Sequence, residues 1–185
     1  MKLDHKRTVL VGLAFLSICA FWQMYDSIVP LILTKTFHMN ETFSGAIMAA
    51  DNILALFLLP FFGSVSDKSH SKLGKRMPFI LFGTGCAIIL MNILPLLDNS
   101  YAAQPSGFKT ASFVIVLGLL LVAMGTYRAP AVALMPDVTP KPLRSRANAI
   151  INLMGAVGGI LYLGVAAVLY PNSKTAGLDH VNYQP

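Results

Sequence analysis

Five long apolar segments alternate with short polar segments along the chain. Each apolar segment has about the 20 residues that a helix needs to cross the hydrocarbon core of a bilayer. The pattern therefore predicts an all-α, polytopic membrane protein with five transmembrane helices, at residues 8–33, 44–63, 79–97, 111–136 and 147–170. The remaining residues, 171–185, are polar and rich in turn formers, which predicts an extracytoplasmic tail or a truncated loop.

The composition favours a membrane protein over a soluble domain. Of the 185 residues, 55% are hydrophobic and only 12% are charged, whereas about 25% of an average soluble domain is charged. Both cysteines, Cys19 and Cys86, lie within apolar segments, where small buried hydrophobic residues are expected. The four histidines lie in polar segments and lack the spacing of metal ligands, so we expect a solvated surface position for His5, His38, His70 and His180.

Lysine and arginine are concentrated in alternate polar segments. Five helices would place ten of them on one side of a membrane, namely Lys2, Lys6, Arg7, Lys68, Lys72, Lys75, Arg76, Lys141, Arg144 and Arg146. The other side would hold only Lys35, Lys109 and Lys174. The positive-inside rule then predicts that the N-terminus is cytoplasmic and that the C-terminus of this chain lies outside. We expect a multi-pass protein of the plasma membrane. The net charge of +6 thus reflects orientation, and nucleic acid is not an expected partner.

Three charged residues, Asp26, Asp51 and Arg128, lie at membrane depth. A charge at the centre of a spanning helix costs about 2.5–3.5 kcal/mol, so such residues are expected to face protein or water and to serve function. Two acids and one base leave at least one carboxylate to exchange a proton or to hold a cation. We predict a coupling site at Asp51 and Asn52 with Arg128 as charge partner. The alternative is a structural Asp–Arg pair that locks helices together.

Polar and small residues mark one face on each of two spans. Trp22, Gln23 and Asp26 are three or four residues apart and share a helix face. An aromatic ring beside a carboxamide and a carboxylate predicts sugar binding, and an interfacial belt of Trp and Tyr is the alternative. The last span carries a polar and small stripe, which either packs closely against another helix or lines a cavity; its members are Asn148, Asn152, Gly155 and Gly159. Asn148 and Asn152 are the further candidate substrate contacts.

The polar segment 63–79, GSVSDKSHSKLGKRMPF, resembles the loop between helices 2 and 3 of the major facilitator superfamily. The matching residues are Gly63, Asp67, Lys68, Gly74, Lys75 and Arg76, with an insert, SHSKL, between the two parts of the motif. The longer loop and its trailing R-x-P-F are similar to those of the glycoside–pentoside–hexuronide cation symporters and the sucrose/proton symporters. Residues 20–33, 45–63 and 127–150 resemble the same branch.

The resemblance implies a secondary transporter that moves a sugar together with a proton or sodium by alternating access. It also implies a charge relay of Asp67, Lys75 or Arg76, and Asp137, with Asp67 bonded to the other half of the molecule. Such proteins have about twelve spans in two six-helix halves. Residues 1–170 would then be a partial N-terminal six-helix bundle, and the partners would be the missing C-terminal half, the lipid bilayer and the solute.

Two other classes of function are alternatives to a transporter. A non-transporting membrane assembly partner, or an inactive truncated remnant, is the alternative to a transporter. An enzyme is not expected, because the sequence has no nucleophile–base set, phosphate loop or metal cluster. No cofactor other than the coupling ion is expected. The residues leave the solute, the choice of proton or sodium and the direction of transport open.

Overall fold

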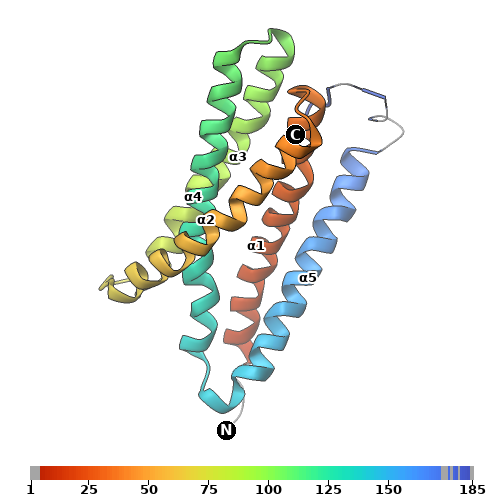
Figure 1. Ribbon diagram of the computed structural model, residues 1–185. Coiled ribbons are helices and arrows are strands. Elements are labelled where there is room, and N and C mark those ends of the chain that lie inside the picture. The colour runs from red at the N-terminus through yellow and green to blue at the C-terminus, as the bar shows by residue number, and fades with distance from the viewer. Residues whose placement is uncertain (1–4, 172–174, 176, 179, 184–185) are drawn as a thin grey trace. The chain divides into compact units, whose positions relative to one another are not determined.

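The computed structural model describes residues 5–171, 175, 177–178 and 180–183. Its elements, in order, are α1 (His5–Leu31), the π-helical η1 (Ile32–Thr36), α2 (Glu41–Lys68), α3 (Met77–Ala103), α4 (Gly107–Val138), the 3-10 helix η2 (Lys141–Leu143) and α5 (Arg144–Leu169) (Figure 1). Five of the described helical stretches are long and apolar enough to cross a membrane. The predicted all-α fold with five spans is thereby confirmed.

The helices extend past the predicted spans into polar sequence. α2 begins at Glu41 rather than at residue 44, because the Asn40 side chain accepts a hydrogen bond from the backbone N–H of Thr42 and caps the helix. α3 continues from the predicted end at residue 97 to Ala103. The sequence that follows Leu97 is polar but contains no helix breaker before Pro105. The extension places Asp98 inside a helix rather than in a loop.

The chain forms two compact units. The first unit comprises residues 1–27 and 131–176, and the second comprises residues 28–130 and 177–185. The division falls within α1 after Ser27 and within α4 after Pro130. Proline lacks a backbone donor and crowds the preceding turn of a helix, and Pro30 and Pro130 stand at or near the two division points.

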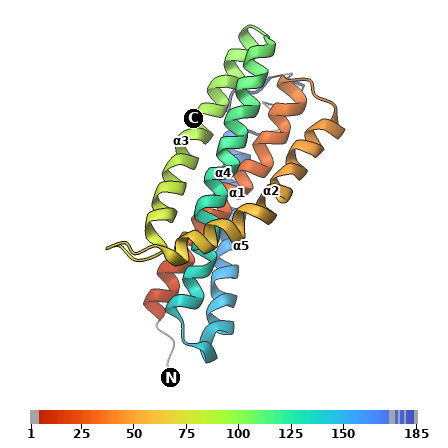
Figure 2. The same ribbon diagram turned by 60° about the vertical axis from the view of Figure 1, so that its left-hand side comes forward.

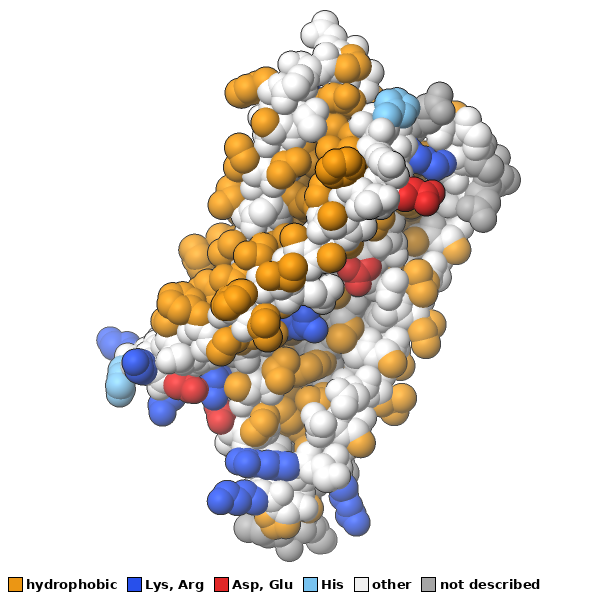
Figure 3. Space-filling model, viewed as in Figure 1, with side chains coloured by type: hydrophobic (Ala, Val, Ile, Leu, Met, Phe, Trp, Pro, Cys, Tyr) orange, Lys and Arg blue, Asp and Glu red, His pale blue; other side chains and the backbone are white. Residues whose placement is uncertain are grey.

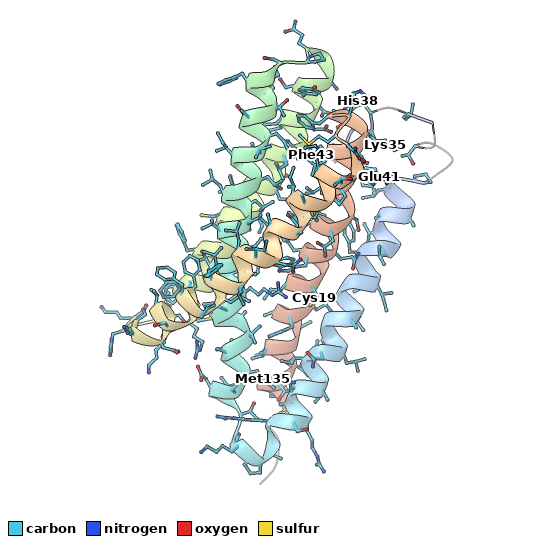
Figure 4. All side chains as sticks on the ribbon, viewed as in Figure 1. Cys19, Lys35, His38, Glu41, Phe43 and Met135 are labelled. Atoms are coloured by element: carbon cyan, nitrogen blue, oxygen red, sulfur yellow. The ribbon has the colours of Figure 1, made fainter. Side chains whose placement is uncertain are left out.

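The first unit packs α1, the end of α4 and α5 around a small apolar core. The buried core residues are Val11, Met135, Ala147 and Ile151, with Phe15 and Leu134 packed against them. α1 and α5 approach closely because glycines face α1: a Cβ built on Gly155 would lie 2.9 Å from Cys19 Sγ. Figure 4 labels Cys19 on α1 and Met135 on α4. Small residues at a helix contact are the usual means of close packing within membranes.

The second unit is held by aromatic and glycine contacts. The ring of Phe37 lies 4.3 Å from that of Tyr101 and 4.6 Å from that of Phe113, measured between centroids. α3 and α4 run side by side (Figure 2), and a Cβ built on Gly83 would lie 2.9 Å from the Cβ of Tyr127. These contacts join η1, α3 and α4.

An apolar surface runs along α2. Its large exposed hydrophobic side chains are Phe43, Ile53, Leu54, Leu56, Phe57, Phe61 and Val65, and hydrophobic side chains gather over α2 in the space-filling view (Figure 3). Exposed apolar patches of this extent mark contact with lipid or with another protein. The surface fits a membrane-spanning helix.

Candidate functional site

The candidate solute residues of α1 lie in the first unit. Asp26 is exposed, and Trp22 and Gln23 are half-buried. The Trp22 and Tyr25 rings meet edge to face with their centroids 6.0 Å apart. Gln23 Nε2 donates to Ser27 Oγ at 3.3 Å, and Ser27 Oγ donates to the Gln23 carbonyl at 2.7 Å. These contacts orient the ring and the carboxamide on the face that also carries the carboxylate.

The glycines and the asparagines of the polar and small stripe on α5 differ in their surroundings. Gly155 is buried against α1, whereas Asn148 and Asn152 are exposed. A Cβ built on Gly159 would lie 3.7 Å from Gln23 Oε1, so the Gln23 side chain reaches α5 near Gly159. The glycine edge therefore packs the helices together, and the asparagines stay available for other contacts. The exposed polar groups Asp26, Asn148 and Asn152 all belong to this unit.

The candidate coupling residues lie in the second unit. Asn52 is exposed on α2 and Arg128 is half-buried on α4. The Asp51 side chain lies outside the described residues, and its pairing with Arg128 stays a prediction. Among the residues that the structure describes, no three His, Cys, Asp or Glu side chains are grouped so that they could hold a metal ion.

Arg76 is at the centre of the predicted charge relay, which is the candidate gate of the transporter. Arg76 Nη2 lies 2.8 Å from Asp67 Oδ1, and the exposed fractions of the two side chains are 10% and 61%. Arg76 Nη1 also donates to Ser66 Oγ at 3.2 Å, and Ser66 Oγ donates to the Gly63 carbonyl at 2.9 Å. Lys75 is exposed. Of the two bases proposed for the relay, Arg76 is therefore the one that forms an ion pair with Asp67.

The remaining gate residues are exposed. Lys68 is the last residue of α2, and Asp137 lies near the end of α4 in the first unit. Both side chains are exposed. The participation of Asp137 in a relay with Asp67 and Arg76 stays a prediction.

At Gly74 of the loop motif, the backbone conformation favours glycine over other residues. Its φ is +96°, where a Cβ is strained, and its N–H donates to the Ser71 carbonyl at 3.0 Å. Gly74→Ala is expected to lower the free energy of unfolding by about 1–2 kcal/mol, measured by denaturant titration of the chain in micelles. Gly63→Ala is the matched control, because a Cβ at Gly63 would meet nothing within 4 Å. Equal stabilities for the two variants would contradict the strained turn.

The second unit contains a polar cluster that the sequence did not predict. The Asp98 side chain is fully buried, and His180 Nδ1 lies 3.6 Å from Asp98 Oδ2. The same nitrogen lies 3.2 Å from Thr36 Oγ1, and His180 Nε2 lies 2.9 Å from Asn99 Oδ1. The prediction that His180 is a solvated surface residue is wrong, because its side chain is only 29% exposed and lies among polar groups of η1 and α3. Asp98 was not a candidate because the apolar run ends at Leu97, so the sequence predicted a loop from Asp98 onward.

Comparisons with known proteins identify the family. Residues 11–175 match the model of the Major Facilitator Superfamily. The sucrose transport protein SUC3 of Arabidopsis thaliana is 35% identical over 72% of this chain and 24% of its own length. The sucrose transport protein SUT3 of Oryza sativa subsp. indica is 36% identical over 69% of this chain and 28% of its own length. SUT1 of Oryza sativa subsp. japonica, also a sucrose transport protein, is 27% identical over 84% of this chain and 31% of its own length.

The matches cover most of this chain but only part of each relative. The chain spans about a quarter of the length of SUC3 and SUT3. No solved structure gives a significant match. The resemblance carried by the loop motif at residues 63–79 agrees with the family model and with these relatives. The chain belongs to the major facilitator superfamily.

Proposed function

We propose that this chain supplies the N-terminal helices of a secondary active transporter that moves sucrose or a similar sugar together with a cation. The relatives named as sucrose transport proteins support a sugar as solute. Superfamily membership supports alternating access, in which two halves rock around a site near the middle of the membrane. A C-terminal half would complete that site.

The observation that carries the proposal is the exposure of Asp26 within an apolar span. A carboxylate exposed at that depth is compatible with a membrane only where it meets water or protein. Asn148 and Asn152 are exposed on α5 of the same unit. Carboxylate and carboxamide oxygens accept hydrogen bonds from sugar hydroxyls, and Trp22 offers a ring face for stacking. These groups would line a water-filled cavity that binds the sugar.

Asp51 is the proposed coupling residue, with Asn52 beside it and Arg128 as charge partner. A carboxylate with a neighbouring carboxamide offers the oxygen ligands that a proton or a hard cation requires. Binding of the cation there would favour the conformation that holds the sugar. The cation is proposed to be a proton or sodium.

The Asp67–Arg76 pair is the proposed gate on the cytoplasmic side. Its loop belongs to the basic set of segments, and the positive-inside rule supports a cytoplasmic N-terminus. The plasma membrane is the proposed location. A contact between a half-exposed acid and a buried base can break and re-form as the two halves rock. The pair would hold the outward-facing state until the inner side opens.

Sugar uptake by vesicles that hold the assembled transporter tests these assignments. Asp26→Asn is expected to reduce both cation-driven accumulation and cation-independent sugar exchange about tenfold, because a charge-assisted hydrogen bond to a hydroxyl becomes a neutral one. Asp51→Asn is expected to abolish accumulation but to spare exchange, because coupling is lost while the sugar site remains.

Glu41→Gln is the matched control, because Glu41 is an exposed carboxylate at the first residue of α2. It should leave both activities unchanged. Unchanged accumulation in Asp51→Asn would remove Asp51 from the coupling mechanism. Unchanged accumulation and exchange in Asp26→Asn would remove Asp26 from the sugar site.

A further inference from the structure

Four exposed basic side chains lie at one end of the first unit, where α1 begins and where α4 leads through η2 into α5. We call them the basic cluster; its members are Lys6, Lys141, Arg144 and Arg146. The core around Val11 and Ala147 joins the three helices at this end, and Arg146 directly precedes Ala147 in the chain. Lysine and arginine side chains gather at the lower end of the space-filling view (Figure 3).

The basic cluster carries an excess of positive charge. Within the described part of the chain, none of its members forms an ion pair. The sequence has no Asp or Glu from residue 138 to residue 178, and Asp137 is the acid nearest to this basic segment along the chain. The basic loop of the second unit differs, because Arg76 there pairs with Asp67 at 2.8 Å. The basic cluster is therefore expected to attract an anion.

Backbone carbonyls at the end of α4 hold the guanidinium of Arg144 in place. Arg144 Nη2 donates to the Pro136 carbonyl at 2.8 Å, and its Nε donates to the Thr139 carbonyl at 3.2 Å. Because arginine has five N–H donors, three remain for a ligand. A phosphate group can accept parallel hydrogen bonds from a guanidinium fixed in this way. Arg144 thus offers a positioned phosphate-binding group, with Lys141 and Arg146 close to it in the chain.

Exposed apolar side chains continue the helix faces on which two of these bases lie. On α1, Leu10 and Leu13 follow Lys6 by four and seven residues and are 67% and 47% exposed. On α5, Leu153 follows Arg146 by seven residues and is 66% exposed. Residues at these intervals share a helix face. The bases and the apolar side chains together match a molecule that has an anionic head and hydrocarbon chains.

We propose that the basic cluster binds the headgroup of an anionic phospholipid, whose acyl chains lie along the exposed apolar faces of α1 and α5. Arg144 donates to the phosphate oxygens, and Lys141 and Arg146 surround the phosphate with positive charge. A choline headgroup is disfavoured, because its quaternary ammonium meets the same positive charges. The positive-inside rule expects this end of the unit on the cytoplasmic side, where anionic lipids give the membrane surface a negative potential.

Native mass spectrometry of this chain in micelles tests the proposal. The chain is mixed with equal amounts of anionic phosphatidylglycerol and zwitterionic phosphatidylcholine that carry the same acyl chains, and the parent should bind mostly phosphatidylglycerol. Each base close to an anionic lipid raises its affinity about fivefold. Lys141→Gln combined with Arg146→Gln is therefore expected to lower the ratio of bound phosphatidylglycerol to bound phosphatidylcholine about twentyfold. This double variant keeps Arg144 and its hydrogen bonds to the end of α4.

A matched double variant separates a defined lipid site from the general effect of net charge. Lys72→Gln combined with Lys75→Gln removes two exposed bases from the loop between α2 and α3, and it should keep the ratio of the parent. Equal binding of the two lipids by the parent, or the same fall in both double variants, would overturn the proposal.

Inorganic phosphate distinguishes a lipid headgroup from a free anion. An excess of phosphate, at an ionic strength matched with chloride, should leave the amount of bound phosphatidylglycerol unchanged, because free phosphate makes no contact with the apolar faces of α1 and α5. Displacement of the lipid by phosphate would show that the basic cluster is a site for free phosphate, and the lipid proposal would then be wrong.

Discussion

Gly158→Ala is expected to lower the free energy of unfolding of this chain by about 3 kcal/mol, the upper end for an added methyl group in a packed contact. A Cβ at Gly158 would overlap the Leu16 carbonyl oxygen and lie 2.8 Å from the carbonyl carbon. The obstacle is backbone, which cannot move aside as a flexible side chain can. α1 and α5 would have to separate, and the contacts around Val11 and Ile151 would weaken.

Gly164→Ala is the matched control on the same helix. A Cβ there would meet nothing within 4 Å, and alanine favours a helix over glycine by up to about 1 kcal/mol. Denaturant titration in micelles, followed by far-UV circular dichroism, gives both free energies of unfolding. If Gly158→Ala is as stable as Gly164→Ala, α1 and α5 do not meet at Leu16.

Most of the fold follows from hydropathy, because in a bilayer every spanning segment must satisfy its own backbone hydrogen bonds. A long apolar run can therefore be only a helix, and five such runs predict five helices. The ends of the helices were harder to predict. Asn40 moves the start of α2 through a cap, and α3 continues to Ala103 through residues that are polar but compatible with a helix.

The candidate site was only partly predictable from the sequence. The spacing of residues along a helix shows which side chains share a face, but it does not show which other helix packs against that face. The face of Trp22, Gln23 and Asp26 follows from intervals of three and four residues. That Gln23 reaches α5 near Gly159 does not follow, since it depends on how two helices pack. Asn99 and His180 are 81 residues apart, and no local pattern joins them.

Sequence spacing also does not show which of the two adjacent bases of the loop, Lys75 or Arg76, pairs with Asp67. Substitutions can distinguish the two bases. Spacing leaves Lys75 and Arg76 equivalent, whereas the structure pairs Arg76 with both Asp67 and Ser66. Arg76→Gln is expected to lower the free energy of unfolding by about 2 kcal/mol, between the values for exposed and buried ion pairs. Lys75→Gln, the matched control, should change it by less than about 0.5 kcal/mol, because Lys75 is exposed.

A double-mutant cycle measures the pair itself. Asp67→Asn, Arg76→Gln and the combined variant should give a coupling energy of about 1–2 kcal/mol, a value typical of residues in direct contact. The same cycle with Lys75→Gln in place of Arg76→Gln should give a coupling energy near zero. A coupling to Lys75 as large as that to Arg76 would mean that the loop exchanges partners, and the gate would then depend on the charge of the loop rather than on one ion pair.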